Sequence, residues 1–167
     1  SINWARIIAQ SVYYFYAYFK AGNGQPVSFS VPTGNFGDIY AGYLAKKLGL
    51  PIDKLIVATN KNDILHRAIS GGDYTQKKVE ETNTPSMDIQ IASNFERLLY
   101  DVKDCNSEVT KDVMSKIKNN TYKIDKSDLD KIKKNFISEM LDENETLEMI
   151  KTINDEHQTV VDPHTAV

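Results

Sequence analysis

The residues best suited to chemistry form one short segment, VPTGNFGD, at positions 31–38. Gly34 and Gly37 bracket a turn, and Asn35 tolerates a left-handed backbone. A helix is expected to begin at Asp38, and the free N–H groups and positive dipole end of a helix start attract anions. The segment therefore predicts a phosphate or carboxylate site that needs no lysine or arginine. An ordinary glycine turn with Asp38 as the helix N-cap accounts for the same residues equally well.

The two common nucleotide-binding patterns are absent from this segment. It is neither GxGxxG, which binds dinucleotides, nor GxxxxGK(S/T), which binds nucleoside triphosphates. A second polar cluster, ATNKND, occupies positions 58–63. Asn60 in this cluster is placed to hydrogen-bond a ligand beside the phosphate, although the pattern favours a turn followed by a helix cap.

Side chains that carry out nucleophilic or metal chemistry are sparse. The sequence shows no nucleophile–base pair and no carboxylate pair with a spacing typical of catalysis. Cys105 is the single cysteine and lies far in sequence from the histidines, which are His66, His157 and His164, so we expect no metal site. One cysteine also excludes an internal disulfide and fits a reducing compartment, which points to the cytoplasm.

Both polar segments follow short apolar runs that are typical of buried strands. The first run is VSFSV at 27–31 and the second is KLIVAT at 54–59, with a helix expected over 38–48 between them. This order makes the two strands parallel neighbours joined by a right-handed crossover. Open α/β sheets bind ligands at the carboxyl ends of their strands. We expect an α/β fold with a mainly parallel sheet and helices on both faces.

Helical periodicity accounts for much of the remaining chain. The first helix contains an apolar series at helical spacing, namely Trp4, Ile8, Val12, Phe15 and Phe19. The aromatic run YYFY at 13–16 is typical of a core or of a partner-binding surface. The expected helices cover residues 2–20, 38–48, 62–70, 86–101, 106–119, 127–135 and 143–155.

Length, charge and composition limit the class of protein. A chain of 167 residues, 41% of them apolar, suits one domain with a sizeable core. A net charge of −3 gives no basic surface for nucleic acid, and polar residues interrupt the most apolar stretch, Ile2 to Phe19, so we expect no membrane span. All eight glycines lie at or before Gly72. We therefore expect the chemistry within 1–100, a polar helical part over 101–157 and a terminal segment over 158–167.

Seven segments carry a resemblance to a known family. They are SINWARI (1–7), YYFY (13–16), VPTGNFGDI (31–39), ATNKNDI (58–64), PSMDI (85–89), SNFERLL (93–99) and DPHTAV (162–167). Each motif is weak by itself. Together and in this order they resemble the threonine synthase family, densely over 1–100, sparsely over 101–155 and again at the end.

The resemblance implies a pyridoxal-phosphate enzyme of fold type II, the fold of the tryptophan synthase β subunit, with this chain in its large domain. Such enzymes are carbon–oxygen lyases acting on phosphates, and they convert O-phosphohomoserine and water to threonine and phosphate. The cofactor's phosphate loop is then formed by Thr33, Gly34, Asn35, Phe36, Gly37 and Asp38. Thr165 matches the hydroxyl residue that hydrogen-bonds the pyridine nitrogen, and Asn3 and Asn60 are substrate or active-site candidates.

The chain departs from the family pattern in one large respect. The family's Schiff-base lysine, which anchors the cofactor and carries protons, lies in a motif that is missing here. No lysine of this chain has a matching context, and neither Lys46 nor Lys61 is a substitute. Both ends of the chain fall within family motifs. We therefore expect a fragment of a threonine synthase that carries much of the cofactor-binding domain and is inactive alone.

Two alternatives stand beside this interpretation. One is a related phospholyase that acts on another phosphorylated substrate, and the other is a non-catalytic module that binds an anion or a partner protein. Apolar surface left exposed where family segments are missing, as on the helix at 2–20, also predicts self-association. The expected partner is a small-molecule substrate rather than nucleic acid or a membrane.

Overall fold

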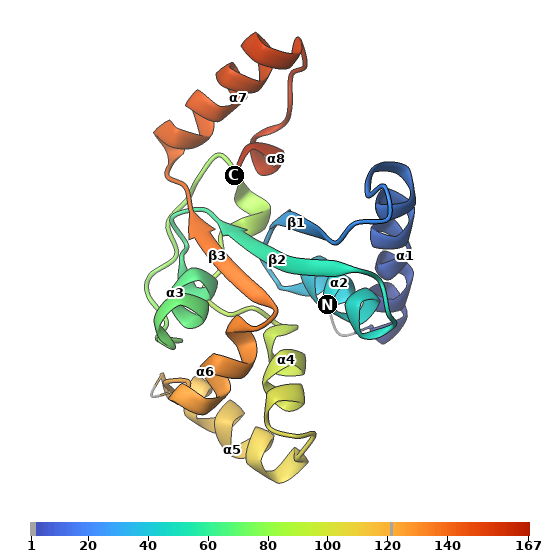
Figure 1. Ribbon diagram of the computed structural model, residues 1–167. Coiled ribbons are helices and arrows are strands. Elements are labelled where there is room, and N and C mark those ends of the chain that lie inside the picture. Colours follow the sequence, from blue (N-terminus) through green and yellow to red (C-terminus); the bar gives the residue numbers. More distant parts are fainter. Residues whose placement is uncertain (1–2, 121) are drawn as a thin grey trace.

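A three-stranded parallel sheet forms the centre of the computed structural model, which describes residues 3–120 and 122–167 (Figure 1). The strands are β1 (Val27–Pro32), β2 (Ile52–Thr59) and β3 (Phe136–Met140), in the order β1-β2-β3. Val31 of β1 pairs with Val57 of β2 in parallel register. The strand–helix–strand unit expected from the sequence is therefore confirmed.

β3 is the strand that the sequence does not predict. It pairs in parallel with β2, with Leu55 opposite Phe136. Of its five residues only Phe136 and Ser138 are buried, so its apolar pattern is too short to be recognised in the sequence. The Phe136 ring packs against the rings of Phe36 and Tyr43, at centroid distances of 5.5 and 5.4 Å. The polar second part of the chain thus supplies a side chain to the core.

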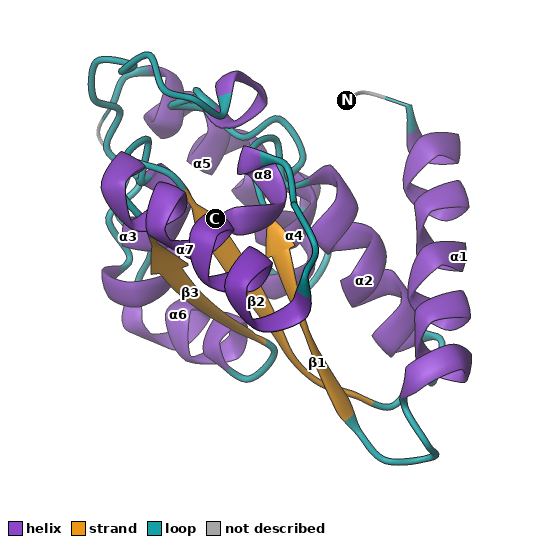
Figure 2. Cartoon of the chain, turned by 90° about the horizontal axis from the view of Figure 1, so that it is seen from above, coloured by secondary structure: helices purple, strands orange, loops and turns teal. Residues whose placement is uncertain are grey.

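The helices lie close to their expected positions, with one exception. They are α1 (Trp4–Ala21), α2 (Gly37–Lys47), α3 (Ile64–Gly71), the 3-10 turn η1 (Pro85–Met87), α4 (Phe95–Val102), α5 (Ser107–Lys118), α6 (Lys126–Lys133), α7 (Glu143–His157) and α8 (Pro163–Ala166). The single helix expected over 86–101 is instead η1 and α4, separated by residues 88–94. Figure 2 shows the strands side by side, with α1 at one margin of the molecule and α3 at the other.

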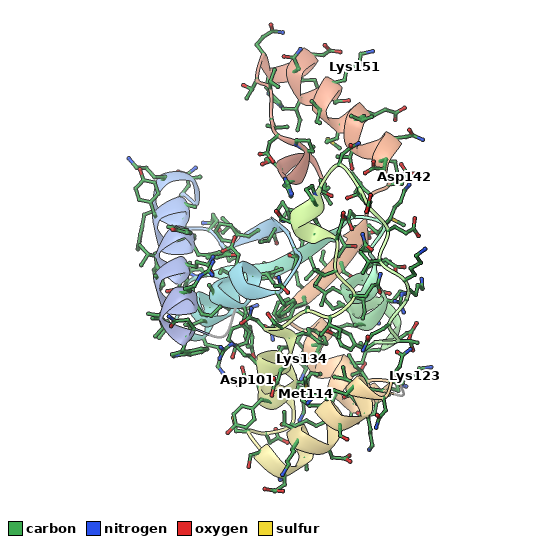
Figure 3. All side chains as sticks on the ribbon, turned by 180° about the vertical axis from the view of Figure 1, so that it is seen from behind. Asp101, Met114, Lys123, Lys134, Asp142 and Lys151 are labelled. Atoms are coloured by element: carbon green, nitrogen blue, oxygen red, sulfur yellow. The ribbon has the colours of Figure 1, made fainter. Side chains whose placement is uncertain are left out.

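α7 projects from the body of the molecule. In Figure 3, Asp142 lies where this helix leaves the body and Lys151 lies farther out along it. A capping box begins the helix: the Asp142 side chain accepts a hydrogen bond from the Glu145 N–H, and the Glu145 carboxylate accepts one from the Asp142 N–H. Only Thr146 of α7 is buried, so local interactions contribute much of what holds this helix.

α1 turns much of its apolar surface to solvent. Its buried residues are Ile7, Ser11, Tyr14 and Tyr18. The apolar series expected from the sequence is exposed at Trp4, Ile8, Val12 and Phe19, up to 78% at Phe19. Gly42 of α2 makes room for the buried Tyr14, because a Cβ at this position would lie 2.5 Å from the Cε1 atom of Tyr14. Glycine therefore lets the tyrosine ring lie against α2.

Helices cover one face of the sheet, and the other face is largely open in the part of the chain that is described. Along the outer strands, Ser28 and Ser30 of β1 and Ile137 and Glu139 of β3 are exposed, whereas the residues between them are buried or half-buried. The expectation of helices on both faces is wrong for these residues. Right-handed crossovers that advance in one direction across a sheet place their helices on one face, which is the physical reason.

Two further findings concern the described residues as a whole. None of their helices is both long and apolar enough to span a membrane. They contain no group of three or more side chains arranged to hold a metal ion. Ser1 and Ile2, which open the SINWARI motif, lie outside the described residues.

Candidate functional site

The loop at 33–38 leaves β1 at the carboxyl edge of the sheet and leads directly into α2. Thr33 fixes its start. The Thr33 N–H donates to the Ala58 carbonyl of β2 at 2.8 Å, and the Thr33 hydroxyl donates to the Val31 carbonyl at 2.5 Å. Thr33 is buried, so these bonds hold the loop to the end of the sheet.

Phe36, rather than Asn35, carries the left-handed backbone of the loop, with φ 63° and ψ 13°. It is the N-cap of α2, which begins at Gly37, so the expectation that Asp38 is the N-cap is wrong. A left-handed conformation costs a bulky residue on the order of 1–3 kcal/mol. Packing offsets this cost, because the buried Phe36 ring meets the Phe95 ring edge-on at 5.2 Å and also contacts Phe136.

The loop presents unused hydrogen-bond donors. Among the described residues, the backbone N–H groups of positions 34–36 have no hydrogen-bond partner. The N–H groups of the first turn of α2 add to them, since a helix start leaves its first donors unpaired. These residues line a cavity of about 400 Å³, together with Arg6 and Gln10 of α1, Ser86 and Asn94. Converging donors and a helix start fit a phosphate-sized anion.

Charge around this cavity is mixed. Asp38 is exposed, yet partial burial of its carboxyl raises its pKa, and the neighbouring Tyr14 partly offsets the rise. The Tyr14 hydroxyl donates to the Asp38 carbonyl at 3.0 Å. In the described part of the chain, the Arg6 guanidinium has no ion-pair partner. Arg6 thus brings an unneutralised positive charge to the wall.

Sequence reasoning missed Arg6 and Gln10. A signal was present, because Arg6 and Gln10 are four residues apart and therefore share one face of α1. The sequence does not say which face of α1 meets α2.

Asn60 is buried within a polar network at the carboxyl end of β2. Its side-chain amide lies within hydrogen-bond distance of Thr82 Oγ1, Thr84 Oγ1 and Asp88 Oδ1, at 2.8 to 2.9 Å. Its side-chain oxygen accepts from the Asn62 N–H at 2.9 Å. The side chain therefore holds the 82–88 segment in place, and its donors are engaged within the protein.

The 82–88 segment in turn touches the loop. A Cβ at Gly34 would lie 2.7 Å from the Ser86 carbonyl oxygen, so η1 packs directly on Gly34. The same turn also contacts α8, because the Ser86 N–H donates to His164 Nε2 at 3.4 Å. Through η1, the structure brings together the loop, the Asn60 network and the terminal segment.

Thr165 and Asn3 are exposed. The Thr165 hydroxyl donates to Asp162 Oδ2 at 2.6 Å, and Asp162 is the N-cap of α8. Asn3 is the N-cap of α1, where its side-chain oxygen accepts from the Ala5 N–H at 2.9 Å. α8 lies near the carboxyl ends of the strands (Figure 1).

A larger cavity, of about 600 Å³, lies between α1, α2 and α4, away from the predicted residues. Several of its polar and charged side chains already have partners within the protein. The Tyr40 hydroxyl and the Lys47 ammonium both hydrogen-bond Asp101, at 3.0 and 3.3 Å, and the Arg97 guanidinium lies over the Trp4 ring at 4.8 Å. The smaller cavity at the loop, with its unpaired donors, is the better candidate for a functional site.

Comparison with known proteins gives one consistent family. No protein-family model matches the chain. Threonine synthase from Saccharomyces cerevisiae is 47% identical over 100% of this chain and 36% of its own length, and threonine synthase from Pseudomonas aeruginosa is 45% identical over the same shares. A crystal structure of pyridoxal-phosphate-bound threonine synthase from Brucella melitensis superimposes with a TM-score of 0.96 at 45% identity, covering 99% of this chain and 36% of that one. The chain thus spans about a third of the length of these relatives, and it belongs to the threonine synthase family.

Proposed function

We propose that this chain is the part of a threonine synthase that holds the phosphate of pyridoxal 5′-phosphate. The whole enzyme would convert O-phosphohomoserine and water to threonine and phosphate. One observation carries the proposal: the unpaired N–H groups at 34–36 and the start of α2 lie in the segment where the resemblance to the family expects the cofactor's phosphate. The pyridoxal-phosphate-bound relative superimposes on 99% of this chain.

The residues of the loop have different roles in binding the phosphate. Gly34, Asn35 and Phe36 offer backbone N–H groups, and Gly37 and Asp38 add those of the helix start. Thr33 supports the loop from the sheet, as its hydrogen bonds to both strands indicate. When bound, the cofactor supplies an electron sink for carbanion chemistry on the substrate.

Thr165 is the proposed partner of the pyridine nitrogen. A hydroxyl donates to this nitrogen without protonating it, whereas a carboxylate would hold it protonated. In this role the Thr165 hydroxyl would turn away from Asp162, to which it now donates. Asn3 stays a candidate for substrate contact. We propose for Asn60 a supporting role, because its amide is already engaged with the 82–88 segment.

The residues of this chain limit the activity that it can have alone. It carries no lysine in the family's Schiff-base context, so we propose that it is inactive alone and that the covalent anchor belongs to another part of the enzyme. We also propose a cytoplasmic location. Residues 1–100 would carry the cofactor motifs, 101–157 the helical support and 158–167 the segment at the cofactor ring.

A hybrid enzyme tests this function. The matching third of yeast threonine synthase is replaced by this chain, and phosphate release from O-phosphohomoserine is measured. We expect release, and we expect none when the hybrid carries Gly34→Val. A folded, cofactor-loaded hybrid without activity contradicts the proposal. Faster release from phosphoserine or phosphothreonine would instead identify a phospholyase with another substrate.

Anion binding by the chain alone is a second function that the unpaired loop donors favour. Titration of inorganic phosphate or pyridoxal phosphate into the chain should show weak binding that the Gly34→Val and Gly37→Val variants lose. Equal binding by all three proteins would show that the loop is not the site.

A further inference from the structure

Asn94 stands at the N-cap of α4 but does not cap this helix. Its backbone has φ −101° and ψ −3°, and its side chain makes no capping hydrogen bond. Asparagine is among the most favourable N-cap residues, so a side chain diverted from this use serves another element. Asn94 is also 0% exposed, which places its amide entirely inside the protein.

The amide of Asn94 is committed to the loop at 33–38. Its Nδ2 atom donates to the Asn35 carbonyl at 3.0 Å, and its backbone N–H donates to the same oxygen at 3.1 Å. These two donors match the two lone pairs of that carbonyl. The Asn94 Oδ1 atom accepts from Arg97 Nε at 3.1 Å. Because a guanidinium only donates and a carbonyl only accepts, this pair of neighbours allows one orientation of the amide.

Fixing the Asn35 carbonyl also fixes the N–H of the next residue. The peptide group is planar and trans, so its C=O and N–H point in opposite directions. The carbonyl held toward Asn94 therefore turns the Phe36 N–H away from Asn94. Beside it, the Phe95 ring meets the Phe36 ring edge-on at 5.2 Å. The consecutive residues Asn94 and Phe95 thus clamp the consecutive residues Asn35 and Phe36.

We propose that Asn94 is a positioning residue for the anion loop. It acts through the Asn35 carbonyl and keeps the 35–36 peptide turned so that the Phe36 N–H stays available to a phosphate. This inference rests on the proposed function of the loop. Gly37 lies close to the same contact, since a Cβ there would lie 3.3 Å from Asn94 Nδ2.

Two substitutions at Asn94 and one control test the role by phosphate binding. Asn94→Asp keeps the shape and the acceptor for Arg97 but puts a carboxylate oxygen against the Asn35 carbonyl. Asn94→Ser removes the side-chain bonds to the Asn35 carbonyl and to Arg97. The control, Thr110→Val, removes a buried hydroxyl that donates to the Asn106 carbonyl at 2.8 Å in α5. Titration of inorganic phosphate into the full chain should show at least about tenfold weaker binding for both Asn94 variants and unchanged binding for the control.

Crystal structures of the variants provide a readout that does not depend on binding. We expect the 35–36 peptide to be rotated or mobile in Asn94→Ser while α4 keeps its place. An unchanged peptide, or folded Asn94 variants that bind phosphate like the parent chain, would overturn the role of Asn94. Failure of both variants to fold while Thr110→Val folds would also overturn it, in favour of a general stability role. If the parent chain binds no phosphate, the proposed anion site is wrong. The orientation of the 35–36 peptide in the crystal structures then tests by itself whether Asn94 positions the loop.

Discussion

At the scale of single residues, the two glycines of the loop are required for different contacts. Gly34 faces backbone, the Ser86 carbonyl oxygen, which has no freedom to move aside. Gly37 faces the end of a side chain, Asn94 Nδ2, at a longer distance. Neither glycine has a positive φ, so the reason for glycine here is space.

Gly34→Ala should therefore damage the loop more than Gly37→Ala. A Cβ 2.7 Å from the Ser86 oxygen forces η1 and the loop apart, and phosphate binding should weaken by at least about tenfold. Gly37→Ala should weaken binding less. Gly71→Ala is the control, because a Cβ at that position meets nothing within 4 Å. Calorimetric titration measures all three, and an equal effect of Gly34→Ala and Gly71→Ala would contradict the assigned contact.

Asp38 predicts a pH dependence. Burial raises its pKa above the ordinary value of 3.8, so the folded chain binds this proton more tightly than the unfolded chain does. The charged carboxylate therefore costs stability at neutral pH, and the cost shrinks as the pH falls through the raised pKa. The same protonation removes a negative charge beside the proposed anion. Sulfate binding should strengthen between about pH 7 and about pH 4, and Asp38→Asn should bind more tightly and with a flatter profile. Identical profiles would place the carboxyl outside the site.

At the scale of elements, β3 links the second part of the chain to the loop. Phe136 from this strand and Phe36 from the loop share one aromatic cluster, so the left-handed conformation of Phe36 depends on a strand one hundred residues later in the chain. The neighbouring residue Ile137 points to the open face of the sheet. The two residues therefore make a matched pair for testing the strand.

Phe136→Ala should lower the free energy of unfolding by about 3–5 kcal/mol, because it leaves a cavity in a fully buried site. Ile137→Ala, on the same strand but 44% exposed, should cost less than about 1 kcal/mol. Urea unfolding followed by circular dichroism measures both. Similar losses for the two variants would show that β3 does not pack as described.

At the scale of the whole molecule, the described residues leave two surfaces open: the outer side of α1 and one face of the sheet. The outer side of α1 exposes Ile8, Val12, Tyr13, Tyr16 and Phe19. Parallel sheets are normally covered on both faces. The relatives are nearly three times as long as this chain, so they have additional segments with which to cover such surfaces.

We expect the chain to self-associate through α1. Light scattering should show a mass that rises with protein concentration, because association removes these apolar side chains from water. The double variant Val12→Lys with Phe19→Lys should reduce the association. The control is Val160→Lys, at an exposed apolar position outside α1, and it should leave the association unchanged. A mass that stays at the monomer value at all protein concentrations would contradict self-association through α1.

The sequence by itself determined the pair of parallel strands and the position of the loop, because these depend on local patterns: apolar runs, glycine spacing and helix periodicity. It also carried the resemblance to the family, through seven motifs in family order. Tertiary structure alone decided which residues complete the loop. Arg6, Ser86, Asn94 and Phe136 reach it from four distant segments, and no local pattern marks them as neighbours. The same holds for Phe36. Packing of its ring against Phe95 and Phe136 offsets the cost of its left-handed backbone. Long-range packing of this kind has no signature in a single stretch of sequence.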